Sequence, residues 1–349
     1  MIGATLNPAP IGAFLFQKVS RAMDVILHVG AHRTATTSFQ RYLERHKPVL
    51  RSHKIAHWGP LQTRSGLFSG LLKKPSNVGA DTARRAQRSS GAIKMEIANL
   101  RRAGFGHLVV SEETMLGSMR QNLAAAALYP DALPRLLRLR APFAANLTRI
   151  VVTIRNYGGY WSSALAYSMC GGARVPAAPT LDRLVTQPRR WRDVLHDVRI
   201  AYPKADIVVC PFESFAGHSD ALLRSAVGGH VIGADFAPDD KWHNHSPTCD
   251  ELRQVLQQRG DDPAAITQDH GRWQPFGDMH RAAFDAQYAQ DIAWLRSGGD
   301  GIVRYLETPF DKTRAEHPYP TLEDIDAGNM PSMAPSAGGL IYGKQRYLV

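Results

Sequence analysis

The stretch over residues 24–43, DVILHVGAHRTATTSFQRYL, joins a short apolar run to a helical pattern through a polar loop. The apolar run covers 25–29 and ends at Gly30, and apolar residues return at helical spacing from Phe39 onward. This order predicts a strand, a tight turn and a helix. Such a turn directs free backbone N–H groups, hydroxyls and the helix dipole toward one point, so it predicts a site for an anion.

The polar loop has one cation, Arg33, which precedes its hydroxyls. It is not a Walker A loop, because Ala35 stands where that motif has a glycine and no lysine follows. The hydroxyls belong to Thr34, Thr36, Thr37 and Ser38. The alternative interpretation is a plain turn that caps a helix, since Thr and Ser are common at helix starts.

A second element covers 149–167, RIVVTIRNYGGYWSSALAY. An apolar strand again ends in polar residues, Arg155 and Asn156, and Ser163 follows eight residues after the arginine at a predicted helix start. A guanidinium group binds phosphate oxygens in a fork, and a serine near a helix N-terminus adds a hydroxyl and backbone donors. A salt-bridged arginine with a capping serine is the alternative. Together, the two elements predict a ligand with two separate phosphate groups.

Strand and helix patterns alternate along the chain. The runs with strand character cover 25–29, 55–58, 108–111, 149–154 and 207–210, and the helical patterns cover 36–50, 83–103, 117–141, 181–199, 250–258 and 280–295. Nearly continuous apolar strands indicate burial on both faces, as in a parallel sheet. We therefore predict an α/β fold with a doubly wound, mainly parallel sheet flanked by helices and a helical C-terminal part. It comprises a leader over 1–23, one domain over 24–308 and a Pro/Gly-rich extension over 309–349.

The formal net charge is +11, from 42 basic and 31 acidic residues, which favours polyanionic ligands. The basic residues are scattered, with pairs such as Arg84-Arg85, and no aromatic residues alternate with them, so we predict no nucleic-acid partner. The three cysteines form no C-x-x-C pair, which favours a reducing compartment. No apolar run reaches transmembrane length, so we predict a cytoplasmic protein with no integral membrane segment.

The two phosphate elements resemble those of the PAPS-dependent sulfotransferases, which use 3′-phosphoadenosine 5′-phosphosulfate. The loop is similar to that family's 5′-phosphosulfate loop, and Arg155 with Ser163 is similar to its 3′-phosphate motif. CPFESF at 210–215, DDKWHNHSPT at 239–248 and FDAQYAQDIAWL at 284–295 resemble later family segments. The resemblance implies a P-loop NTPase-like fold and transfer of a sulfuryl group from this co-substrate, without a metal, to a hydroxyl or amine. The predicted acceptor is a small molecule, a carbohydrate or a lipid head group, and the basic surplus favours an acidic one such as a carbohydrate or an anionic lipid head group.

The resemblance also implies roles for individual residues. Arg33, in place of the family's commoner lysine, would neutralise charge on the bridging oxygen as the sulfuryl group leaves. Arg155 and Ser163 would hold the 3′-phosphate. Ala35 replaces a commoner glycine. Thr34, Thr36, Thr37 and Ser38 would hold the 5′-phosphate. Gly30, Arg33 and Ala35 complete the predicted co-substrate contacts in this loop.

A general base must take the acceptor's proton. Glu113, after the run at 108–111, is the predicted base, and Glu112 and His57 are the alternatives. His28 lies inside a strand pattern and is predicted to be a packed core histidine. The H-x-H pair at 243 and 245 lacks a supporting acidic or cysteine cluster, so we predict no metal there. Two alternative functions remain open: a P-loop-like small-molecule kinase and a non-catalytic nucleotide-binding relative.

Overall fold

The computed structural model describes residues 23–231, 236 and 245–309. These belong to one compact unit. The predicted leader and C-terminal extension lie outside the described residues, except Met23 and Pro309 at their inner ends. Among the described helices, none combines the length and the apolar character needed to cross a bilayer.

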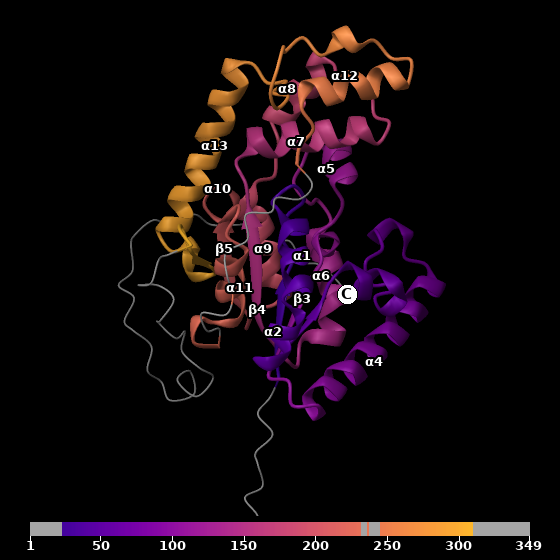
Figure 1. Ribbon diagram of the computed structural model, residues 1–349, viewed down its shortest axis with the longest axis vertical. Coiled ribbons are helices and arrows are strands. Elements are labelled where there is room, and N and C mark those ends of the chain that lie inside the picture. The colour runs from indigo at the N-terminus through magenta and orange to yellow at the C-terminus, as the bar shows by residue number, and fades with distance from the viewer. Residues whose placement is uncertain (1–22, 232–235, 237–244, 310–349) are drawn as a thin grey trace, which may run out of the picture. The chain divides into compact units, whose positions relative to one another are not determined.

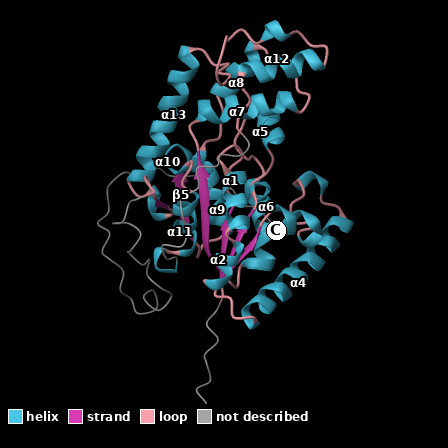
Figure 2. Ribbon diagram, viewed as in Figure 1, coloured by secondary structure: helices cyan, strands magenta, loops and turns pink. Residues whose placement is uncertain are grey.

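Within the described part, six strands form one parallel sheet in the order β2-β3-β1-β4-β5-β6. Strands of this sheet are drawn in magenta in Figure 2. The strands are β1 (Asp24–His28), β2 (Ile55–Trp58), β3 (His107–Ser111), β4 (Leu147–Ile154), β5 (Asp206–Pro211) and β6 (Arg304–Tyr305). The predicted α/β class with a parallel sheet is confirmed. The two-residue β6 was not predicted, because so short a run has no readable period.

Helices surround this sheet, and several gather beyond one end of the strands (Figure 1). Their bounds are α1 (Thr36–Arg45), α2 (Lys47–Ser52), α3 (Pro60–Gln62), α4 (Ala80–Arg102), α5 (Met119–Ala125), α6 (Ala132–Phe143), α7 (Tyr157–Cys170), α8 (Ala178–Val185), α9 (Trp191–Ala201), α10 (Phe212–Phe215), α11 (Ser219–Val227), α12 (Cys249–Gln258) and α13 (Asp278–Arg296). The predicted helical character after residue 212 is confirmed for the described residues.

The sheet is buried on both faces because successive side chains of a strand point to opposite sides. On β1, Val25 and Leu27 join the hydrophobic cluster that includes residues of α4, α6, α7 and α9. Ile26 joins the opposite cluster, with residues of α1, α2 and α11. Continuous apolar strands of this kind are what a doubly covered parallel sheet requires.

Three predicted helices are each divided in the structure. The pattern at 117–141 forms α5 and α6, separated where Ala126 and Tyr129 take left-handed backbone angles, with φ of 46° and 45°. The pattern at 181–199 forms α8 and α9, with Pro188 between them. The pattern at 36–50 forms α1 and α2. Proline removes a backbone donor and disfavours helix in the residue before it, so apolar spacing alone overestimated helix length.

Candidate active site

The candidate site lies at the carboxyl ends of β1 and β4. β1 and β4 are neighbours in the sheet, and the chain leaves β1 toward β2 at one edge but leaves β4 toward β5 and the opposite edge. Ligands of open α/β sheets bind at such a switch point. A pocket there holds about 740 Å³ of empty space, part of it open to solvent. It takes lining residues from the loop after β1 and from the end of β4.

The loop after β1 is closed by its own threonines. Thr34 Oγ1 donates to the carbonyl oxygen of Ala31 at 2.7 Å, and Thr36 Oγ1 donates to the same oxygen at 3.2 Å. Gly30 has a φ of +51°, and a Cβ built there would lie 2.5 Å from Thr36 Oγ1. The turn therefore requires glycine at this position.

The loop does form the turn of the alternative interpretation, but none of its hydroxyl residues is the N-cap of α1. The residue at the N-cap of α1 is Ala35, which makes no side-chain hydrogen bond to the helix. Ala35 has a φ of 60° and Arg33 a φ of 63°, so two L-residues adopt the left-handed conformation in this short turn. Strain of this kind clusters at functional sites. Thr36 and Thr37 line the pocket, whereas Thr34 and Ser38 are buried and do not.

The Arg33 side chain reaches from the β1 loop to α7 and to a later loop. Its Nε donates to Ser163 Oγ at 2.8 Å, and its Nη2 donates to Ser246 Oγ at 3.3 Å. The two serine hydroxyls are themselves 2.5 Å apart. The guanidinium lies 5.0 Å from the ring centroid of Tyr167. Arg33 is therefore held in one position by two hydroxyls and an aromatic face.

Arg155 completes the link between the two strands. Its Nη1 donates to the carbonyl oxygen of Arg33 at 2.6 Å, and its guanidinium lies 4.4 Å from the ring centroid of Phe212. Burial lowers the pKa of Arg155 to about 10, Glu213 opposes this shift, and Arg33 and Arg272 add to it. Arg155 stays charged at neutral pH. The contribution of the other arginines to the shift indicates a positive local potential, which favours an anion.

Ser163 differs from its predicted placement at a helix start. It lies in the second turn of α7, where backbone N–H groups bond within the helix. The true N-cap is Asn156, whose side-chain oxygen accepts from the backbone N–H groups of Gly158 at 2.9 Å and Gly159 at 3.3 Å. Ser163 therefore offers a hydroxyl to the site but no free helix donors.

Among the pocket residues for which the sequence predicted no ligand contact are three from a late segment: His245, Ser246 and Arg272. They come from one late part of the chain, where Thr248 and Arg272 form an antiparallel bridge. The family resemblance at 239–248 pointed to this segment, but residues 239–244 lie outside the described part. Among the described residues, Arg272 brings the lining arginines to three, with Arg33 and Arg155, against one lining carboxylate, Glu113.

Glu112 is committed to a structural role. Its buried carboxylate accepts from Arg64 Nη2 at 2.7 Å and Nε at 3.0 Å, from Thr63 Oγ1 at 2.5 Å, and from Thr114 N and Oγ1. Burial acts to raise its pKa, but the hydrogen bonds of Arg64 and Thr63 and the Arg64 charge hold it below the usual value. With its oxygens occupied, Glu112 is a poor candidate for a base.

Glu113 lines the pocket, as its predicted role requires. Its Oε2 accepts from Gln40 Nε2 at 3.1 Å, and its Oε1 accepts from Arg64 Nη2 at 3.0 Å. His57, the third candidate base, is on the edge strand β2 and is not among the lining residues. Burial lowers its pKa to about 4, against the charge of Glu44.

His32 is a lining residue that sequence reasoning passed over. Its Nδ1 lies 3.0 Å from the hydroxyl of Tyr129, which also accepts from the His32 backbone N–H at 2.7 Å. Burial lowers the pKa of His32 to about 4, while the charges of Glu113 and Glu112 oppose the shift. A neutral imidazole beside Arg33 therefore faces the same pocket as Glu113. The sequence signal that could have indicated His32 is its position directly before Arg33.

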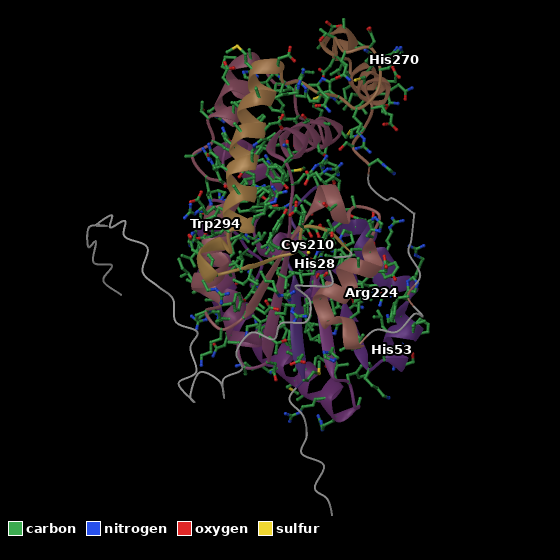
Figure 3. The ribbon with its side chains drawn as sticks, turned by 90° about the vertical axis from the view of Figure 1, so that its left-hand side faces the viewer. His28, His53, Cys210, Arg224, His270 and Trp294 are labelled. Atoms are coloured by element: carbon green, nitrogen blue, oxygen red, sulfur yellow. The ribbon has the colours of Figure 1, made fainter. Side chains whose placement is uncertain are left out.

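His28 is confirmed as a core histidine. It is 1% exposed, its Nδ1 lies 2.8 Å from Ser111 Oγ, and its ring packs edge-on against Phe39. Figure 3 shows it among the strands, far from His270 in the helical part. The described residues hold no group of three or more His, Cys, Asp or Glu side chains placed to bind a metal ion. His243 of the H-x-H pair lies outside them.

The structure thus brings Arg33, Thr36, Thr37, Arg155 and Glu113 to one pocket, with Ser163 directly behind Arg33. Gly30 and Thr34 shape the loop from behind the pocket wall. No family model, no curated protein and no solved structure matches this chain.

Proposed function

We propose that this pocket binds 3′-phosphoadenosine 5′-phosphosulfate and transfers its sulfuryl group to an acceptor hydroxyl or amine. The observation that supports the proposal best is the linkage of Arg33 to Arg155 and Ser163 across two neighbouring strand ends. It gives two cations and several hydroxyls from the two predicted phosphate elements in one pocket. Three lining arginines suit a ligand with several negative charges.

In the proposed reaction, the acceptor oxygen attacks sulfur, and the bond from sulfur to the 5′-phosphate oxygen breaks. The electron pair of that bond stays on the leaving phosphate, where Arg33 and the loop N–H groups stabilise the charge. Arg155 holds the 3′-phosphate, and Ser163 supports it from behind by fixing Arg33, so that the direction of attack is set. The acceptor's proton passes to a base in the pocket. Glu113 is the proposed base, and His32 is a second candidate because it lines the same pocket in neutral form.

Two finer proposals accompany this function. The strand order around β1, with a phosphate-sized turn after it, supports a P-loop NTPase-like fold. The cysteines Cys170, Cys210 and Cys249 are unpaired, which supports a reducing compartment such as the cytoplasm.

Calorimetry with adenosine 3′,5′-bisphosphate, the desulfated nucleotide, tests the binding step. We expect wild type to bind it and Arg155→Ala to weaken binding on the order of a hundredfold, because a charge-assisted contact is lost. The matched control is Arg174→Ala, an exposed arginine that does not line the pocket. Absence of binding by wild type, or equal weakening in both variants, would overturn the proposal.

Thermal-shift measurements separate this function from its alternatives. A kinase predicts stabilisation by ATP with Mg²⁺ above that by the sulfuryl donor. A non-catalytic relative predicts donor binding without slow release of sulfate. If the protein is such a non-catalytic relative, the double variant Arg33→Lys/Ala35→Gly, which has the commoner family residues, would raise the rate of sulfate release strongly above the near-zero rate of wild type.

A further inference from the structure

The basic surplus of the chain is concentrated in one segment. Residues 41–102 hold 14 of the 42 basic residues but only 3 of the 31 acidic ones. The formal net charge of this segment is therefore +11, equal to that of the whole chain, and the basic and acidic residues of the rest cancel. Within this segment the basic residues are spread over its whole length. The fold brings them together, because this segment contains α2, β2 and α4.

We call residues 41–102 the β2 edge, because β2 is the terminal strand of the sheet. Its helices flank that strand on both faces: Leu50 of α2 packs in one hydrophobic cluster, and Ile93 and Ile97 of α4 pack in the other. α4 lies outermost on its side of the sheet (Figure 1). Its buried stripe faces the core, so its charged residues face solvent.

Exposed basic residues follow one another over the broad solvent-facing side of α4, and we call this series the row. Arg84, Arg85 and Arg88 occupy little more than one turn, and Asp81 is the acidic residue beside them, 2.5 Å from Arg84 and 3.7 Å from Arg85. Lys94, Arg101 and Arg102 continue the row to the end of the helix. A helix of this length spans about 35 Å. Such a row fits an extended polymer with repeated negative charges.

The row continues toward the pocket. Lys73 and Lys74 are exposed in the loop before α4. Arg64, in the η1 segment (Thr63–Leu67), is 49% exposed and contacts both Glu112 and Glu113. Glu113 lines the pocket. A chain lying along α4 can therefore reach the proposed transfer point past Arg64.

We propose that the β2 edge binds a linear polysaccharide with carboxylate or sulfate groups and presents one of its hydroxyls to the pocket as the acceptor. This proposal rests on the proposed function, since a carbohydrate supplies the hydroxyl that the transfer needs. A lipid surface fits less well, because the charges lie on both faces of the edge and not in one plane. Single-stranded nucleic acid also fits less well, because the large exposed apolar residues here are Leu61 and Met95, which offer no aromatic stacking surface.

Calorimetry without any sulfuryl donor tests this surface, with polygalacturonate as the anionic probe and dextran as the neutral one. We expect binding of polygalacturonate at 150 mM salt that weakens as salt rises, and no binding of dextran. The variant Arg84→Gln/Arg85→Gln/Arg88→Gln should weaken binding about tenfold, or about 1.4 kcal/mol. The charge-matched control Arg174→Gln/Lys204→Gln/Arg296→Gln, at exposed positions outside the edge, should change it less than twofold.

Equal weakening in both triple variants, or no binding by wild type, would overturn the proposal. So would tighter binding of duplex DNA or of phosphatidylglycerol vesicles than of polygalacturonate. If the α4 variant fails to fold, Lys73→Gln/Lys74→Gln tests the same row from a loop. Because no donor is present, failure here is distinct from failure of bisphosphate binding. If the protein binds the polymer but not the bisphosphate, the β2 edge is a polysaccharide-binding surface, and the claim that it presents an acceptor is wrong.

Discussion

The Nη1 atom of Arg155 donates a hydrogen bond to the carbonyl oxygen of Arg33 at 2.6 Å. This contact joins the end of β4 to the loop after β1, so the two predicted phosphate elements form one unit. The bond uses Nη1 of the Arg155 guanidinium group, so a phosphate would be bound by the remaining N–H groups. We therefore expect the charge of Arg155 and the planar shape of its guanidinium group to contribute separately to nucleotide binding.

Arg155→Lys should weaken binding of adenosine 3′,5′-bisphosphate about tenfold although the charge is kept, because an ammonium group cannot hold the Arg33 carbonyl and a phosphate in a fork. Calorimetry measures the change, with Arg174→Lys as the control. Binding equal to wild type would mean that charge alone matters at this position.

Gly30→Ala should lower the free energy of unfolding by about 2 kcal/mol, because an L-residue at positive φ is strained and its Cβ would lie 2.5 Å from Thr36 Oγ1. Gly91→Ala is the matched control in the exposed middle of α4, where a new Cβ meets no atom within 4 Å. It should stabilise by about 1 kcal/mol. Urea unfolding measures both, and the same sign in both would contradict the loop geometry.

Ala35→Gly should leave the free energy of unfolding within about 0.5 kcal/mol of wild type, or raise it. Relief of the left-handed strain at φ 60° offsets the added freedom of glycine in the unfolded chain. Ala92→Gly, at an exposed position inside α4, should lower it by about 1 kcal/mol. Similar losses in both variants, measured by urea unfolding, would mean that Ala35 is not strained.

Glu112→Gln should lower the free energy of unfolding by about 2 kcal/mol, because the buried carboxylate loses its charge-assisted bonds to Arg64. Glu113→Gln should change it by about 0.5 kcal/mol or less, since its side chain lines the pocket. Thermal unfolding compares the two. A larger loss for Glu113→Gln would reverse their assigned roles.

Stability should fall as pH drops from about 6.5 to about 4. Burial lowers the pKa of His57 to about 4 in the folded protein, while the unfolded chain titrates near ~6.5. The unfolded state therefore binds more protons in this window and gains from acid. His57→Leu should reduce the slope of the free energy of unfolding against pH by up to ~1.4 kcal/mol per pH unit. His270→Gln, with a side chain 87% exposed, should leave the slope unchanged.

Much of the site was predictable because the carboxyl ends of parallel strands meet at one edge. That rule brought Arg33 and Arg155 together from positions more than a hundred residues apart. It could not supply Arg272, which forms a bridge with Thr248 in a segment that has no periodic signal. The rule also could not distinguish Glu112 from Glu113. Both residues follow the end of β3 at Ser111, and the turn that follows, rather than the strand, decides where each side chain points.

The contacts between the two strand ends are crossed. Arg155 of β4 holds the backbone of the β1 loop, and Arg33 of that loop holds Ser163 on the helix after β4. Each half of the pocket is thus positioned by a side chain from the other half. A substitution in one half displaces a partner in the other, so in descendants of this chain positions 33, 155 and 163 should be inherited, lost or replaced as a set.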